Sequence, residues 1–140
     1  MRRNQRGLAV SVEAAVVLPV IVLFIGLLLT LGRVALAQQH VGSAAAAGAR
    51  AASLERNVGS AASAADAAVA AALSHRNLAC RGTSVVADVG GVSRPLGTPA
   101  SVSVHVLCEV DLADVSLPFI PGSISVEAER SSPVDPLRGK

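Results

Sequence analysis

Residues 14–31 read AAVVLPVIVLFIGLLLTL and contain no charged side chain and one hydroxyl, that of Thr30. As a helix rising about 1.5 Å per residue, this stretch is about 27 Å long, close to the thickness of the hydrocarbon core of a bilayer. Its length and composition predict a transmembrane helix over residues 8–32. Pro19 lies inside it and is expected to kink the helix, which a membrane span tolerates.

Basic residues flank this segment unequally. Arg2, Arg3 and Arg6 precede it, whereas Arg33 alone follows it closely. Because the more basic flank of a membrane span usually stays in the cytoplasm, residues 1–7 are predicted to be a cytoplasmic leader. The protein is therefore expected in the cell membrane as a single-pass protein, with everything after about Arg33 exported.

Three outcomes of processing are compatible with this segment. It can stay as a permanent signal anchor. It can be removed as a secretory signal, because Ala35-Leu36-Ala37 matches the small-x-small pattern of signal peptidase sites and cleavage would leave Gln38 first. The third outcome is a cut on the cytoplasmic side of the apolar segment, at Gly7.

Glu13 stands just before the uninterrupted apolar stretch. A carboxylate at the centre of a bilayer costs on the order of 2.5–3.5 kcal/mol, and less near the boundary. One interpretation is a boundary residue whose carboxylate reaches the lipid headgroups. The other is a carboxylate that pairs with a cation, most plausibly a freed α-amino group on a neighbouring subunit.

An ordered set of short motifs surrounds these positions. The set comprises Arg6-Gly7, residues 12–15 (VEAA), residues 17–19 (VLP), Gly32-Arg33, residues 47–53 (AGARAAS), Leu117-Pro118 and Pro121-Gly122. The set resembles the pattern of TadE-like pseudopilins and extends over most of the chain. The order of the Gly, Glu, Pro and Gly-Arg positions is its most specific part.

The resemblance implies a minor pilin-like subunit of a tight-adherence (Flp-type) pilus or secretion system. Its partners would be other pilin-like subunits, the inner-membrane assembly platform, membrane lipid and, transiently, a prepilin peptidase. The peptidase would cut after Gly7, leaving Leu8 first, and Glu13 would be the pilin-type glutamate used for assembly by charge pairing. In the family this glutamate is usually the fifth residue of the mature chain, whereas Glu13 is the sixth from Leu8.

The chain after Arg33 remains favourable to helix. Residues 34–57 contain no proline and are rich in alanine, so we predict one long helix over residues 8–54. A second helix is expected over residues 59–74, capped by Ser60 or Ser63, which makes residues 33–78 an exported helical stem. Ala44, Gly48 and Ala52 form a row that would allow close helix approach, although alanine-rich sequence also produces such rows by chance, the interpretation we favour.

The remaining chain favours strands. Residues 101–112 alternate in period two and predict a strand with one buried face, and residues 83–89 and 123–131 favour two more. Gly90-Gly91 and the linker 117–122 are expected to be turns. We therefore predict an α+β, pilin-like fold in which residues 79–131 form a small three-stranded antiparallel sheet module and residues 132–140 a mobile tail.

Cys80 and Cys108 are the two cysteines, and both lie in the part expected to be exported. In an oxidising compartment such a pair favours a disulfide over two free thiols. His75 and His105 could complete a zinc site with them, but His105 and Cys108 are three residues apart on a predicted strand and leave opposite faces. A disulfide is therefore preferred to a metal site.

The composition excludes several functional classes. Hydrophobic residues make up 51% of the 140 residues, charged residues 16%, and the formal net charge is +2. Nucleic acid is not expected as a partner, because no basic patch with interleaved aromatic residues is visible. No phosphate-binding loop, dinucleotide fingerprint or local catalytic triad occurs, so we expect no enzymatic activity and no cofactor.

Two functions other than a pseudopilin stay open. One is a small secreted binding module that signal peptidase releases after Ala37. The other is a generic single-pass accessory protein, which would keep its N-terminus intact and need no prepilin peptidase.

Overall fold

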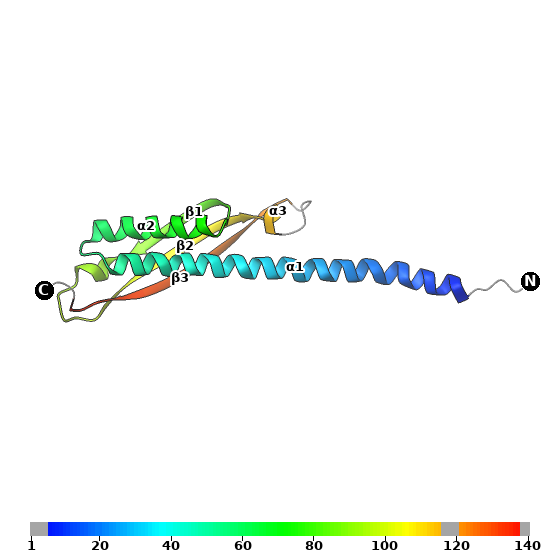
Figure 1. Cartoon of the computed structure of the whole chain (residues 1–140), viewed down its shortest axis with the longest axis horizontal. Coiled ribbons are helices and arrows are strands. Elements are labelled where there is room, and N and C mark those ends of the chain that lie inside the picture. Colours follow the sequence, from blue (N-terminus) through cyan, green and yellow to red (C-terminus); the bar gives the residue numbers. More distant parts are fainter. Residues whose placement is uncertain (1–5, 116–120, 138–140) are drawn as a thin grey trace, which may run out of the picture.

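The computed structural model describes residues 6–115 and 121–137, and their side chains over 12–113 and 121–137. It confirms the α+β fold, with a long N-terminal helix, a second short helix and a three-stranded antiparallel sheet (Figure 1). The elements in chain order are α1 (Arg6–Ser53), α2 (Val58–His75), β1 (Cys80–Asp88), the 3-10 helix η1 (Gly90–Ser93), β2 (Ala100–Asp111), α3 (Leu112–Val115) and β3 (Ser123–Val134).

Helix α1 is continuous over 48 residues, as predicted. Its N-terminal part projects away from the other elements, and its C-terminal part lies beside α2 and the sheet (Figure 1). The absence of internal helix breakers other than Pro19 explains this length, since alanine and leucine have the highest helix propensities. Glycines 42 and 48 do not interrupt the helix.

Helix α2 packs against α1 after a short connection. The cap predicted at Ser60 or Ser63 is wrong, because Asn57 is the N-cap and its side-chain oxygen accepts a hydrogen bond from the Ser60 backbone N–H at 2.7 Å. Asn57 has the extended backbone that an N-cap requires, so the helix begins at Val58, one residue before the predicted start.

Gly48, the middle position of the predicted row of small residues, lies against α2. Ala44, Gly48 and Ala52 are all buried. A Cβ added to Gly48 would lie 2.8 Å from Val69 Cγ2 and 3.3 Å from the Ala65 carbonyl oxygen, both in α2. At Gly48 this row therefore allows close approach of α1 and α2, whereas Ala44 and Ala52 are buried without a printed contact to α2.

The sheet has the order β1-β2-β3, and both pairings are antiparallel. The alternation predicted for the central strand is confirmed, because the side chains on one face of β2 are buried: Val102, Val104, Val106, Cys108 and Val110. These residues pack in one hydrophobic core with α1 and α2, while Glu109 on the other face is exposed. Leu112, predicted to end the strand, begins α3 instead.

Strand boundaries differ from the prediction at both outer strands. Strand β1 begins at Cys80, three residues before the predicted start. Strand β3 continues to Val134, so the tail predicted from residue 132 begins too early. Val134 pairs with Ala100 and is 4% exposed, and this burial extends the strand beyond Pro133.

The turn predicted at 117–122 is described only in part, because residues 117–120 lie outside the described residues. Gly122 has a φ of +140°, and its carbonyl oxygen accepts a hydrogen bond from the Leu112 backbone N–H.

The connection from β1 to β2 passes through η1, where a turn was predicted at Gly90-Gly91. A Cβ on Gly91 would overlap the backbone carbonyl of Ser101 at the start of β2. Because backbone atoms cannot yield as a side chain can, glycine is required at this close approach.

Candidate functional site

The projecting part of α1 has an apolar surface with no partner in the described chain. Its large hydrophobic side chains from Val12 to Leu31 are about half to two-thirds exposed, and none of its most apolar stretch is buried. By length and composition this is one helix able to cross a membrane. Exposing so much apolar surface to water would be strongly unfavourable, whereas lipid tails solvate it.

Burial along α1 begins at Val34, which is partly buried against the core. Leu36 is 54% exposed, but Ala37 is 5% exposed and Val41 is fully buried. Buried positions then recur along α1 to Ser53. The sheet domain therefore starts directly where the apolar segment ends, with Arg33 between the two, and no flexible linker separates them.

The predicted assembly residues lie along the projecting part of α1. Glu13 is exposed, and none of the described residues pairs with its carboxylate. Gly7 and Leu8, the predicted processing positions, belong to the first turns of α1, and their side chains lie outside the described part. The helix continues through Pro19, so the kink expected there stays a prediction.

The predicted disulfide is present. Cys80 at the start of β1 is bonded to Cys108 of β2, with their Cα atoms 5.4 Å apart. Both sulfur atoms are used in this bond. His105 lies beside Glu127, and its Nε2 atom is 3.6 Å from the Oε2 atom of Glu127. These positions therefore do not assemble into the zinc site considered from the sequence.

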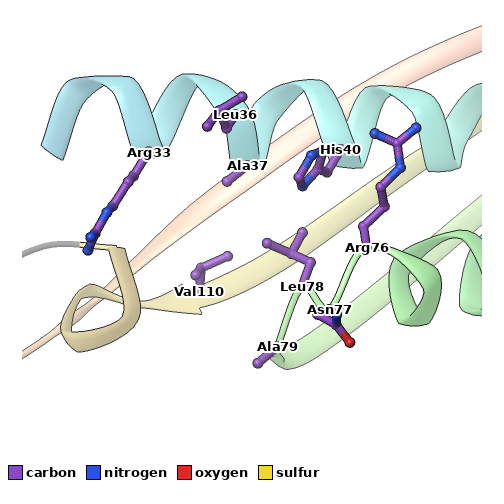
Figure 2. A pocket seen from close by; sticks show the side chains of 9 residues that line it. All are labelled: Arg33, Leu36, Ala37, His40, Arg76, Asn77, Leu78, Ala79 and Val110. Atoms are coloured by element: carbon purple, nitrogen blue, oxygen red, sulfur yellow. The ribbon is translucent and has the colours of Figure 1, made fainter. Parts of the chain in front are cut away.

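A cavity of about 390 Å³ lies where the domain meets the apolar segment, between α1 and the connection from α2 to β1 (Figure 2). Three basic side chains line it: Arg33 and His40 from α1, and Arg76 after α2. The other lining residues are Leu36, Ala37, Asn77, Leu78, Ala79 and Val110. Arg33 lies at one end of the cavity and His40 and Arg76 at the other, with the apolar side chains of Leu78 and Val110 between them (Figure 2).

Sequence reasoning missed this cavity as a site. From the sequence, Arg33 was considered as a charge that follows the apolar segment and as part of the Gly32-Arg33 motif, but not as a lining residue, and Arg76 belongs to no motif. Arg33 and Arg76 line opposite ends of one cavity because α2 returns alongside α1, a contact between distant segments that local patterns do not report (Figure 2). The charge of Arg33 immediately after an apolar helix was the one available signal.

These features define a class of protein: a small α+β domain carried directly on a helix long and apolar enough to span a membrane. Within that class, residues 9–50 match the family model of TadE-like proteins. The match confirms the predicted resemblance over nearly all of α1, and it does not extend to the sheet. No curated protein and no solved structure matches the chain.

Proposed function

We propose that this protein is a minor pseudopilin, a membrane-anchored structural component of a tight-adherence pilus or secretion system. The observation that carries the proposal is the coincidence of the TadE-like match with α1, whose first half is an exposed apolar helix. In this proposal the N-terminus is cytoplasmic, the sheet domain is exported, and the protein acts by assembly rather than by enzymatic catalysis.

Assembly would use the projecting half of α1. This apolar helix packs against the helices of other pilin-like subunits or of the assembly platform in the membrane. Glu13 would pair with the α-amino group of a neighbouring subunit. In a medium of low dielectric constant this pairing offsets the cost of a lone carboxylate, and it sets the axial register of the two helices.

The amino group arises from processing. A prepilin peptidase hydrolyses the peptide bond after Gly7, which removes the basic leader and makes Leu8 the first residue. The leader carries Arg2, Arg3 and Arg6, so its removal also deletes the charges that hold the N-terminus at the cytoplasmic surface.

The test is the intact mass and N-terminal sequence of the protein recovered from membranes and from the medium. We expect a membrane form that starts at Leu8, and retention of the full leader in a Gly7→Val variant. A membrane form that starts at Met1 in the wild type would contradict pilin-type processing and favour a generic anchored accessory protein.

A second candidate, a secreted binding module, is favoured by one observation. Release after Ala37 would keep the buried core positions of α1 from Val41 onward. In the same measurement, a soluble form starting at Gln38 would support this candidate and overturn the pseudopilin proposal.

A further inference from the structure

We infer that the Cys80–Cys108 bond is a redox-sensitive attachment for the N-terminal half of β1, residues 80–84. When the bond is reduced, this segment separates from β2 while the rest of the domain stays folded. The inference concerns the sheet domain and does not need the pilin role. The place where the bond forms does rest on the export of the domain in the proposed function.

Apolar burial does not hold this segment in place. Residues 81–84 are all exposed, and none of the nine residues of β1 is fully buried. The C-terminal half of the strand differs, because Val85 and Ala87 pack against the core and the chain continues into Val89, which is 6% exposed. The hydrophobic effect therefore fixes the end of β1 and not its beginning.

The polar contacts of the segment are also weak. The register with β2 shifts between Cys80 and Gly82, and such an irregularity disrupts the hydrogen bonds of the ladder locally. Arg81 forms an ion pair with Asp111 at 3.3 Å, but these side chains are 67% and 38% exposed. Exposed ion pairs contribute little to stability. The disulfide is therefore the strongest contact described for residues 80–84.

The bond joins this exposed segment to the middle of the core. Cys80 is half-buried, whereas Cys108 is fully buried between Val106 and Val110 on the inner face of β2. On the other side, Leu78 is partly buried against the core, and its carbonyl oxygen accepts a hydrogen bond from the Cys80 N–H. Opening after reduction is therefore confined to the residues that follow Leu78 and precede Val85.

Reduction of the bond is a thiol–disulfide exchange with a dithiol. One thiolate of the dithiol attacks the Cys80 sulfur, because Cys108 is buried, and Cys108 leaves and takes up a proton. The second thiol then attacks the mixed disulfide, which releases Cys80 as a thiol and leaves the reductant as a disulfide. Formation is the reverse reaction, in which a disulfide-donating oxidoreductase accepts the two electrons. Such donors act in oxidising compartments, so residues 80–84 would become fixed after export.

The experiment is hydrogen exchange of the full-length protein in detergent, followed by mass spectrometry, with and without dithiothreitol. Reduction should speed exchange of the protected amides among residues 81–84 about 100-fold or more, and exchange of residues 126–130 in β3 less than about threefold. Cys80→Ala without reductant should match the reduced wild type. This variant removes the bond and keeps the Cys108 side chain in the core.

Leu73→Ala is the matched control, because it keeps the bond and removes a side chain that is only 6% exposed. It should destabilise the whole domain and speed exchange in β3 at least as much as in residues 81–84. Two results would overturn the inference. One is unchanged exchange of residues 81–84 in both the reduced wild type and Cys80→Ala. The other is an equal rise in β3, which would show global unfolding.

A separate measurement tests the export on which the timing depends. Treatment of cells with a maleimide should modify neither cysteine of the membrane-bound protein, because both are in the bond. Two free thiols there would contradict export into an oxidising compartment. The absence of a difference in hydrogen exchange would instead contradict only the attachment of β1.

Discussion

Gly48 of α1 lies directly against Val69 of α2, at a distance that leaves no room for a methyl group between them. Val69 is 1% exposed, and the Val104 side chain of β2 approaches the same position, 3.4 Å from where a Cβ would stand. Gly48 is therefore the point where both helices and the sheet meet, and the absence of a side chain there sets how closely they pack.

Gly48→Ala should destabilise the protein. Alanine favours a helix over glycine by about 1 kcal/mol, but overpacking a core costs about 1–3 kcal/mol, so we expect a net loss of up to about 2 kcal/mol in the free energy of unfolding. Gly42→Ala is the matched control in the same helix, because its Cβ would meet the flexible end of Arg130. Chemical denaturation followed by circular dichroism compares the two, and equal stability would contradict the packing argument.

Gly91→Ala should be more damaging. The new Cβ would overlap the Ser101 carbonyl, so η1 or the start of β2 must move, and we expect a loss of about 3 kcal/mol or more. Gly90→Ala is the neighbouring control, since its Cβ would lie 3.4 Å from Asp88 Oδ1 and within ordinary contact range. Yields of folded protein and unfolding midpoints measure both, and a Gly91→Ala variant as stable as Gly90→Ala would refute the close approach.

The Cys80–Cys108 bond has a sequence separation of 28 and therefore closes a loop of 29 residues, counting both cysteines. Because this loop restricts the unfolded chain, loss of the bond should lower the free energy of unfolding by about 3.6 kcal/mol. Unfolding of the wild type with and without a reducing agent measures this difference. The Cys80→Ala, Cys108→Ala variant should show low stability under both conditions. A reducing agent that leaves the wild-type midpoint unchanged would contradict the prediction.

Glu13→Gln should reduce assembly without reducing membrane insertion. The amide removes the charge that would pair with a partner's amino terminus, so recovery of the protein with its pilin-like partners should fall roughly tenfold or more. Insertion should be at least as efficient, because a neutral side chain enters the apolar phase at lower cost. Glu129→Gln, on an exposed position of β3, is the control. Wild-type recovery of Glu13→Gln would exclude charge pairing.

Much of the fold could be predicted because its patterns are local. The alternation over Val102–Val110 indicates which face of β2 is buried. The uncharged stretch around Phe24 indicates a helix long and apolar enough to span a membrane. Helix caps were harder, since Asn57, Ser60 and Ser63 are all suitable and only the backbone of Asn57 adopts the cap conformation. The end of β3 also depends on a distant partner, Ala100, that no local pattern reveals.

The residues of the candidate site also fall into two groups: those that the sequence could predict and those that only the fold brings together. Glu13 and the cysteine pair were found because charge in an apolar helix and an even cysteine count are visible along the chain. The contact of Gly48 with Val69 and the cavity between Arg33 and Arg76 arise from how α2 lies on α1. Alanine-rich sequence conceals such contacts, since many alternative rows of small residues would be equally suitable for close packing.

The continuity of α1 has a mechanical consequence. Because one helix is both the apolar segment and part of the domain core, a movement of the α1 residues from Ala37 onward would be passed on to the sheet that packs against them. A shift of the helix along its axis by one turn, about 5.4 Å, would move the whole domain by the same distance. Rotation about that axis would likewise carry the outer face of the sheet around the helix, because α1 and the sheet share one hydrophobic core.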